Sequence, residues 1–322
     1  MTPRPFTRLS LFLLLLASGQ AVVADDANVW LKKMHEAAQR LDYEGNFVHQ
    51  HDTRLEAMRI VHKVEQGAVR ERLVSLNGPA REIIRNEREV LCYLPDQNSV
   101  VVEHRKTDGK GFPAILPERL AELGEHYNLM LGKRERIAGR PAQQLGIQPR
   151  DGYRYGYRLW ADVDTGLLLK ADLLNDKGKV LEQFMFTHIR VGSVPAAALE
   201  PENPGKGMVW YREGAEAARP GPVRSWTATR LPKGFKLTRQ VWRTVAMRQK
   251  QVEHLVYSDG LATVSVFVEQ LGPDAKSGMD GPSHMGAVHA YVTRADGHQV
   301  TTVGEVPAET VAQIAKSVAP GR

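Results

Sequence analysis

Residues 153–174, YRYGYRLWADVDTGLLLKADLL, indicate the fold most clearly, because two neighbouring segments within them are rich in bulky side chains. Alternation along a β-strand places one set of side chains on one face and a second set on the other: Tyr153, Tyr155, Tyr157 and Leu159 against Arg154, Arg158 and Trp160. After the turn Asp164-Thr165-Gly166, the run Leu167-Leu168-Leu169 is apolar on both faces too. We therefore predict that the sheet is covered on both sides here, by the core on one and by a helix, ligand or partner on the other.

Short strand-like segments joined by tight turns surround this stretch, from residue 43 to residue 189. The joints include Gln66-Gly67, Asn77-Gly78-Pro79 and Asp176-Lys177-Gly178. Such short joints favour antiparallel neighbours, because parallel pairing needs a long crossover. Helices are predicted at about 27–41 and 116–131. The fold class is therefore α+β and predominantly antiparallel β, with a large sheet curled over one or two helices and a concave apolar face.

A change of composition separates two domains. Residues 204–222 are rich in proline, glycine and charged residues, as expected of a linker. A smaller C-terminal domain of strands follows at 223–318, closed by a helix that begins at Pro307. Residues 272–286 are glycine-rich and are predicted to form a loop. The large domain is predicted to span 25–203.

The first 24 residues have the composition of a secretory signal peptide. Arg4 and Arg8 precede the apolar run 9–16, and Val22-Val23-Ala24 ends in a small residue suited to cleavage. Removing Arg4 and Arg8 from the 43 basic residues leaves 41 against 37 acidic ones, a net charge of +4. In the periplasm, where this signal predicts the chain to work, nucleic acid is not an expected partner. Cys92 is the single cysteine, so no internal disulfide framework is expected.

The sequence carries none of the common catalytic signatures. It has no G-x-S-x-G elbow, S-x-x-K motif, H-E-x-x-H motif or phosphate-binding loop. His49 and His51 share one face of a strand and are the only tempting metal pair, but no third ligand is indicated nearby. Ser258-Asp259 is the best residue pair for a hydrolase, and no base can be assigned to it. We therefore predict a binding protein with no catalytic residue, metal or cofactor.

Two features stand out as candidate surfaces. The tyrosines of 153–157 pack against core in the simpler interpretation, although their polar tips also suit an amphipathic ligand such as a lipid. Residues 223–250 contain eight basic and no acidic residues, interleaved with Trp226, Phe235 and Trp242. A run of one charge is often only a solvated face. It is equally explained by binding to an anion or an acidic peptide, which would relieve the repulsion among the cations.

Several short motifs together resemble the RseB/MucB family of periplasmic regulators. They are Tyr43-Glu-Gly-Asn-Phe-Val48, Glu71-Arg-Leu-Val-Ser-Leu-Asn-Gly-Pro-Ala-Arg-Glu82, Tyr153-Arg-Tyr-Gly-Tyr-Arg-Leu-Trp160, Thr165-Gly-Leu-Leu-Leu-Lys170, Tyr257-Ser-Asp-Gly-Leu-Ala262, Ser265-Val-Phe-Val-Glu269 and Val303-Gly-Glu-Val-Pro307. The resemblance spans essentially the whole chain after the signal. It implies a large domain like the half-barrel of the lipoprotein carriers LolA and LolB, and a small C-terminal domain of a sheet with a helix.

The resemblance also implies a function. Members of this family bind the periplasmic part of a single-pass anti-sigma factor, here one like MucA, and shield it from a site-1 protease. Lipopolysaccharide, lipid A or lipoprotein acyl chains are the expected releasing signals, with control of an envelope-stress sigma factor and of alginate production as the output. The alternative is a periplasmic lipid or lipoprotein carrier without a regulatory partner. The open edges of the large sheet would also allow a homo-oligomer.

Residues can be assigned to each expected activity. Lipid is expected at the aromatic stretch, through Tyr153, Tyr155, Tyr157 and Trp160. The anti-sigma segment is expected on the small domain, at a surface that includes Trp226, Arg230, Arg239 and Trp242.

Overall fold

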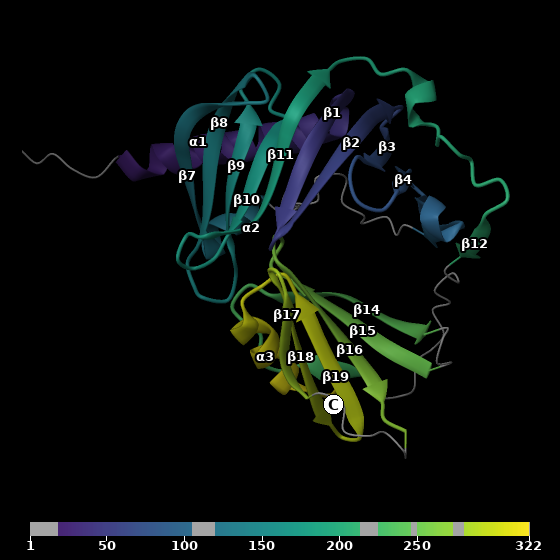
Figure 1. Ribbon diagram of the computed structural model, residues 1–322. Helices are drawn as coiled ribbons and strands as arrows, with labels where there is room; N and C mark the ends of the chain where they lie inside the picture. The colour runs from purple at the N-terminus through teal and green to yellow at the C-terminus, as the bar shows by residue number, and fades with distance from the viewer. Residues whose placement is uncertain (1–18, 105–119, 213–224, 246–249, 273–279, 322) are drawn as a thin grey trace, which may run out of the picture.

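Two main β-sheets of different size, the larger covered by two helices and the smaller by one, form two domains that lie one above the other in Figure 1. The computed structural model describes residues 19–104, 120–212, 225–245, 250–272 and 280–321. Within these ranges, no helix combines the length and the apolar character needed to cross a bilayer.

The large sheet has 12 strands in the described part of the chain, in the order β12-β6-β5-β4-β3-β2-β1-β11-β10-β9-β8-β7. All neighbours are antiparallel except β12 and β6. The predicted antiparallel sheet is therefore confirmed, and it stays open between β12 and β7. The strands are β1 (Tyr43–His51), β2 (Arg54–Glu65), β3 (Ala68–Ser75), β4 (Glu82–Arg85), β5 (Glu89–Leu94), β6 (Ser99–His104), β7 (Tyr127–Ile137), β8 (Arg140–Pro149), β9 (Gly156–Asp162), β10 (Leu168–Leu174), β11 (Val180–Val191) and β12 (Val209–Arg212).

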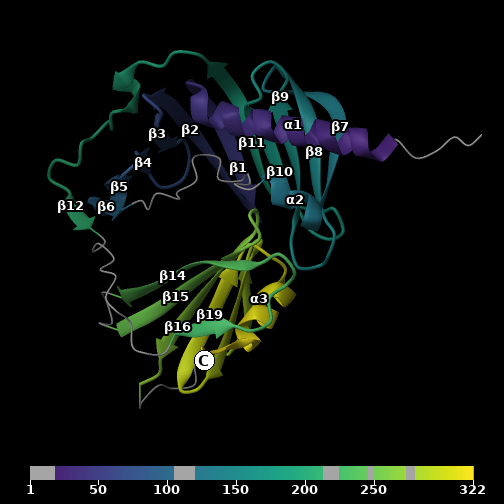
Figure 2. The same cartoon turned by 180° about the vertical axis from the view of Figure 1, so that it is seen from behind.

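Two helices cover one face of this sheet. Helix α1 (Gly19–Arg40) crosses strands β7 to β11 in Figure 2, and the shorter α2 (Leu120–His126) lies beside it. Leu31 and Met34 of α1 are fully buried in the same apolar cluster as Phe47 and Phe186 of the sheet. The curled sheet over one or two helices is thus confirmed. Much of its concave face is filled by α1, so that face is largely core.

The predicted helix at 116–131 is corrected to a much shorter one. Residues 116–119 lie outside the described ranges, and α2 ends at His126, where β7 begins at Tyr127. Leu129 and Leu131 pack against the core while Met130 between them is 45% exposed, which is the period of a strand. Leu123, Tyr127 and Met130 have the spacing of one face of a helix, although Leu123 belongs to α2 and the other two belong to β7.

The start of β9 also differs from the prediction. The strand begins at Gly156, and Tyr153 lies in the preceding loop. The carboxylate of Asp151 accepts a hydrogen bond from the Tyr153 backbone N–H at 3.0 Å and from two guanidinium nitrogens of Arg154. These local bonds hold residues 151–155 out of the β ladder, so the expected alternation begins only at Tyr157.

Part of the predicted linker belongs to the large sheet. Residues 209–212 form β12, which pairs in parallel with β6, and Trp210 packs edge-on against Tyr93 at 6.2 Å between ring centroids. The rest of the predicted linker that the structure describes, residues 204–208, folds against the same edge, where Trp210 Nε1 donates to Gly205 O. A strand of four residues within a proline- and glycine-rich stretch has too weak a pattern to be predicted.

The small domain is a 6-stranded sheet in the described residues, ordered β14-β15-β16-β19-β18-β17, with helix α3 (Ala308–Lys316) on one face. Its strands are β14 (Lys236–Val245), β15 (Lys250–Ser258), β16 (Thr263–Gln270), β17 (Gly281–Met285), β18 (Val288–Ala295) and β19 (His298–Gly304), and a separate pair is formed by β13 (Trp226–Ala228) and β20 (Val318–Pro320). The expected sheet with a C-terminal helix is confirmed. Strand β17 lies inside the predicted loop 272–286, which is a correction, and β20 was not predicted.

Candidate functional site

The tyrosine-rich stretch lies where the two domains meet. Tyr155 and Tyr157 are only 6% and 8% exposed. The Tyr155 hydroxyl lies 3.3 Å from Nδ1 of His289, and the Thr310 hydroxyl donates to the backbone oxygen of Tyr153 at 2.7 Å. His289 and Thr310 both belong to the small domain. The tyrosines predicted to face lipid therefore face the small domain in this structure.

Trp160 is separated from the tyrosines by the sheet itself. It follows Tyr157 by three residues in β9, so the two side chains lie on opposite faces. Its Nε1 donates to the Glu135 carboxylate at 2.9 Å, and the ammonium of Lys170 lies 4.3 Å from the ring centroid. The four predicted lipid residues thus divide between the junction and the outer face of the sheet. They do not form one surface.

Arg154 anchors the small domain to the large one. Its guanidinium is fully buried and donates to the Asp259 carboxylate at 2.5 Å and to the Lys233 backbone oxygen at 2.6 Å. The hydroxyl of Tyr127 donates to the same Asp259 oxygen at 2.9 Å. A buried charge pair is maintained only when its remaining hydrogen bonds are satisfied, as they are here. Burial, and then the negative charge of Asp259, raise the pKa of Tyr127, so its hydroxyl keeps the proton that it donates.

Apolar and close backbone contacts surround this anchor. Leu261 and Ala287 of the small domain are buried in the main apolar cluster of the large domain. The guanidinium of Arg154 also lies over the rings of Tyr127 and Phe235, 5.5 and 5.2 Å from their centroids. At Gly234 a Cβ atom would stand 2.2 Å from Nε2 of His126, so only glycine allows this approach. The junction is therefore a packed interface.

The other half of the junction is acidic. Glu305, in the turn between β19 and α3, is partly buried and hydrogen-bonds the hydroxyl of Tyr157. Burial first, and the nearby Glu182 carboxylate second, raise the pKa of Glu305 to about 7. Glu182 lies 3.4 Å from Nε2 of His49, and this contact raises the pKa of the His49 imidazole. Groups that titrate near neutral pH therefore lie between the two domains.

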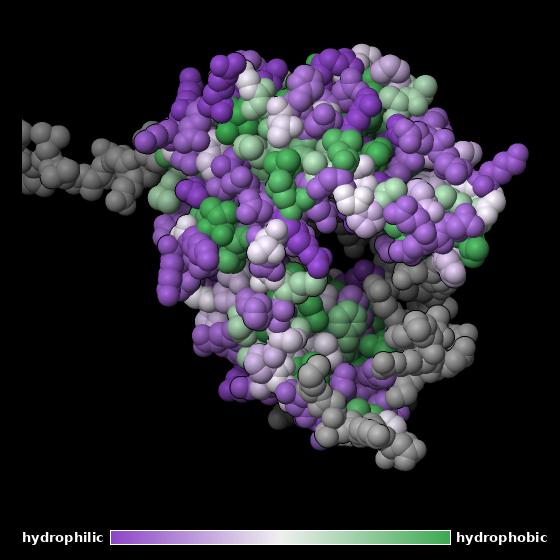
Figure 3. Space-filling view, in the orientation of Figure 1, coloured by the Kyte–Doolittle hydropathy of each residue, from purple (hydrophilic) through white to green (hydrophobic). Residues whose placement is uncertain are grey.

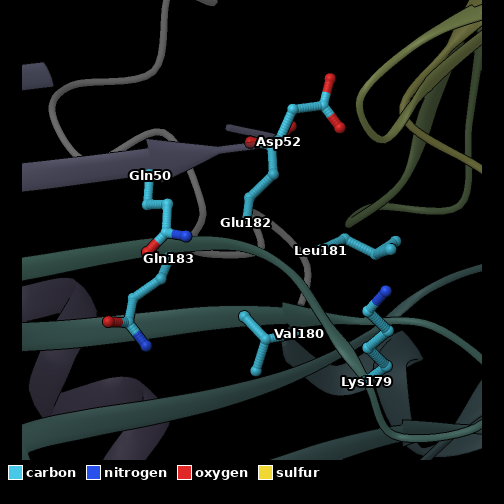
Figure 4. A pocket seen from close by; sticks show the side chains of 7 residues that line it. All are labelled: Gln50, Asp52, Lys179, Val180, Leu181, Glu182 and Gln183. Atoms are coloured by element: carbon cyan, nitrogen blue, oxygen red, sulfur yellow. The ribbon is translucent and has the colours of Figure 1, made fainter. Parts of the chain in front are cut away.

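A groove of about 370 Å³ opens beside this acidic half. Figure 4 shows its lining side chains, which come from the end of β1 and the start of β11: Gln50, Asp52, Lys179, Val180, Leu181, Glu182 and Gln183. A larger groove of about 550 Å³ lies where β2, β3 and the turn at 77–81 meet. Its lining combines the cations Arg54 and Arg81 with Leu55 and Met58. That mixture is amphipathic.

The basic segment of the small domain follows its outer strand. Arg230, Lys233 and Lys236 are exposed, and Arg239 is partly buried on β14. Trp242 is also partly buried on this strand. The side chains of Arg243, Arg248 and Lys250 lie outside the described residues. A cationic face on an edge strand is thus present, as the sequence predicts, although it is narrower than the segment 223–250.

Trp226 departs from its predicted place on that surface. Its side chain is 4% exposed and belongs to the apolar core of the small domain. Its backbone N–H donates to the carboxylate of Glu253, which also accepts from the Gln240 side chain. An indole buried in this way packs into the core beneath β13 and presents little surface to solvent. The exposed candidates are Arg230 and the residues of β14.

The histidines proposed as a metal pair are engaged by carboxylates. His49 lies beside Glu182, and Nε2 of His51 lies 3.9 Å from Glu56. Among the residues whose placement is described, no three histidine, cysteine, aspartate or glutamate side chains gather as metal ligands. Ser258, the serine considered for hydrolysis, donates to Ala262 O and accepts from the Gly260 N–H in the turn between β15 and β16.

The junction itself could not be predicted from the sequence. Arg154 was assigned to a strand face, and Asp259 was weighed only as a partner of Ser258. A usable signal did exist, since an arginine flanked by three tyrosines and an aspartate in the turn Ser-Asp-Gly are both unusual positions for a solvated charge. Pairing them across 105 residues required the tertiary structure.

Two family models match this chain and together cover most of it. The MucB/RseB N-terminal domain matches residues 26–203, and the MucB/RseB C-terminal domain matches residues 221–319. The chain belongs to the MucB/RseB family. A similar member is the sigma factor AlgU regulatory protein MucB of Pseudomonas aeruginosa, 38% identical over 97% of this chain and 98% of the relative. The sigma-E factor regulatory protein RseB of Escherichia coli is 27% identical over 94% of each chain.

Solved structures of a MucB/RseB protein share this fold. MucB in complex with the periplasmic part of MucA matches with a TM-score of 0.72 at 34% identity, over 92% of this chain and 100% of that one. MucB alone matches with a TM-score of 0.64 at the same identity and coverage of this chain, over 98% of the solved chain.

Proposed function

We propose that this chain is a periplasmic regulator that binds the periplasmic part of a membrane anti-sigma factor like MucA. The observation that carries the proposal is its similarity, over nearly the whole chain and both domains, to MucB, which has been solved in complex with that part of MucA. Binding of this kind would shield the anti-sigma factor from a site-1 protease and so control an envelope-stress sigma factor, with alginate production as an output. No catalytic step is needed for this role.

The cationic face of β14 is the surface that we propose for the partner. Arg230 and Lys236 are exposed, and Arg239 lies between them and Trp242 along the chain. Leu237 is an exposed apolar side chain in the same strand. Cations around an apolar side chain suit an extended acidic segment, and β14 is an edge strand in the described sheet, so its backbone is accessible for strand addition. Trp226 would support this surface from within the core.

Lipid is the releasing signal that we propose. Tyr155 and Tyr157 form the apolar edge of the domain junction, and acyl chains that compete for this edge would favour an arrangement with separated domains. Tyr153 directly precedes this edge, whereas Trp160 lies on the opposite face of the sheet. If separated domains hold the anti-sigma segment less tightly, lipid and partner weaken each other's binding by one common factor.

Calorimetry with the purified periplasmic segment of the anti-sigma factor tests the partner proposal. The double reversal Arg230→Glu with Arg239→Glu should weaken binding at least tenfold, because two attractive charge contacts become repulsive. The matched control is Arg88→Glu, an exposed arginine of the large domain, which should leave affinity unchanged. Unchanged affinity in the double variant would remove β14 from the proposal.

A lipid or lipoprotein carrier is the second candidate. A carrier would bind acyl chains in the absence of any anti-sigma segment and would show no affinity for that segment. The arginine anchor and the attached small domain favour the regulator, since a carrier needs neither. Binding of lipid with no measurable binding of the segment would favour the carrier.

A further inference from the structure

The contacts between the domains divide into two halves of opposite electrostatic character. Arg154, Asp259 and Tyr127 form a neutral, fully paired half. Glu305 and Glu182 form the other half, with His49 as the nearest group that can carry positive charge. Among the residues that the structure describes, neither carboxylate has a lysine or arginine within ion-pair distance. The charge at this half is therefore set by protons alone.

Every element packed around Glu305 brings polar or titratable groups. Strand β9 and its preceding loop contribute Tyr157 and Tyr155, and β18 contributes His289, whose Nδ1 lies 2.9 Å from Val306 O. A Cβ at Gly286, between β17 and β18, would lie 3.4 Å from a carboxylate oxygen of Asp52 and 3.7 Å from one of Glu182. Other ionisable groups near this half are His51, Glu56, Asp176, Lys179, Asp259 and His284.

Among the described residues, the contacts between the domains gather along one side. Figure 3 shows a hollow between them on the side of β14 to β16, while α3 and the tyrosine segment lie on the other side in Figures 1 and 2. Contacts confined to one side allow the small domain to swing about that side, and moderate interfaces between domains commonly permit such motion. The acidic half lies among these contacts, so its charge acts directly on the docking equilibrium.

We propose that Glu305, Glu182 and His49 form a proton-controlled latch, which holds the domains together in acid and loosens them as the pH rises toward neutrality. In the docked state a proton on Glu305 removes its repulsion with Glu182 while the hydrogen bond to Tyr157 remains. Loss of that proton leaves two carboxylates facing each other at a partly buried interface. With Glu305 protonated, the latch therefore supports docking together with the anchor at Arg154. With Glu305 ionised, it opposes that anchor.

The direction of the pH dependence of docking follows from proton linkage. Docking raises the pKa of Glu305 from its ordinary value of 4.5 to about 7, chiefly by burial and then by the charge of Glu182. Its contribution to docking is therefore complete below pH 4.5 and is lost as the pH rises to about 7. His49 and Glu182 belong to the same domain, so their contact is present in either arrangement, and only the smaller effect of Glu305 on the pKa of His49 depends on docking. Within this window the docking equilibrium constant changes by up to about tenfold per pH unit for one proton.

Distances between spin labels on the two domains test the latch. The labels are attached at Arg88→Cys and Arg294→Cys, both exposed in the parent, in a Cys92→Ala chain. The measurement is made at pH 5, 6, 7 and 8, also with Asp259→Asn, which weakens the anchor so that opened molecules are populated. We expect the long-distance population to grow several-fold from pH 5 to pH 7 and then to level off.

Three variants locate the effect. Glu305→Gln keeps a hydrogen-bonding side chain without the charge and should stay docked at every pH, whereas Glu309→Gln, an exposed glutamate one turn away, should behave like the parent. Glu182→Gln removes the repulsion and should shift the transition to lower pH. The latch is refuted if the Asp259→Asn chain shows no pH dependence, or if Glu305→Gln retains the parental dependence.

Discussion

At the scale of single residues, Asp259 bonds both to its own turn and to the other domain. One carboxylate oxygen accepts from Arg154 and Tyr127, and the other accepts the backbone N–H groups of Leu261 and Ala262 at 2.9 and 2.8 Å. The same side chain therefore closes the turn between β15 and β16 and fixes the small domain to the large one. This double duty explains why a turn residue carries a buried charge.

Replacing Asp259 by asparagine should destabilise the protein by about 3 kcal/mol, because breaking a buried ion pair leaves its partner uncompensated. Asparagine can still accept the two turn N–H groups, so the effect reports the lost charge and not a broken turn. Urea unfolding followed by tryptophan fluorescence measures it. Asp176→Asn, at an exposed turn, is the control and should change stability by less than about 0.5 kcal/mol. A loss as small as the control's would contradict a structural role for the pair.

Tyr127→Phe should cost about 1 kcal/mol, the usual contribution of one hydrogen bond. Within the described residues its hydroxyl donates only to Asp259, so the two substitutions report on one network. In an Asp259→Asn background the cost of Tyr127→Phe should therefore shrink toward zero. A double-mutant cycle by urea unfolding gives the coupling directly, and full additivity would show that the hydroxyl acts independently of Asp259.

At the scale of elements, the central pairing of β1 with β11 depends on a position that excludes side chains. At Gly45 an added Cβ would stand 2.4 Å from the backbone oxygen of His188 and 3.2 Å from the Phe186 ring. The register of these strands slips by one residue just after this point, between Asn46 and Phe47. Glycine at this position lets the strands approach where the irregularity brings them together.

Gly45→Ala should therefore destabilise the large domain by about 2 kcal/mol through overpacking. Thermal unfolding by circular dichroism measures the shift, which should be toward lower temperature. Gly178→Ala is not a fair control because that glycine has a positive φ. Gly124→Ala is the better control, since its added Cβ would meet nothing within 4 Å. Equal effects of the two substitutions would argue against a steric cause at Gly45.

The limits of prediction from the sequence also lie in the elements. Antiparallel pairing, the first helix and the final helix follow from period and turn chemistry, so they could be predicted. The junction of α2 with β7 could not, because Leu123, Tyr127 and Met130 keep a helical spacing across a change of element. Strand β12 could not be predicted either: its four residues are all exposed, including Tyr211 at 60%, and only the pairing with β6 makes them a strand.

The candidate site was harder to predict than the fold for a related reason. Strand alternation correctly indicated that Tyr157 and Leu159 are covered, but it could not say by what. The cover turned out to be core and small domain, an answer that depends on contacts such as Arg154 with Asp259 and Tyr155 with His289. Sequence periodicity describes one element at a time, whereas a surface between domains is made by residues far apart in the chain.

At the scale of the whole molecule, the proposed function joins two surfaces through one junction. The cationic face of β14 belongs to the small domain, and the apolar edge at Tyr155 and Tyr157 lies buried at the junction of the domains. A ligand that uses the buried edge must separate the domains. A partner that prefers the docked arrangement must oppose such a ligand, whatever the distance between the two surfaces.

This arrangement makes a quantitative prediction about linkage. If lipid A fragments weaken binding of the anti-sigma segment by a given factor, the segment must weaken binding of lipid A by the same factor, because both ligands act on one docking equilibrium. Calorimetric titrations in both orders measure the two factors, which we expect to lie between about 5 and 150, the usual range of such couplings. Asp259→Asn, by favouring separated domains, should tighten lipid binding and weaken segment binding in the same preparation. If both ligands instead bind with unchanged affinity when the anchor is broken, the junction does not link the two surfaces.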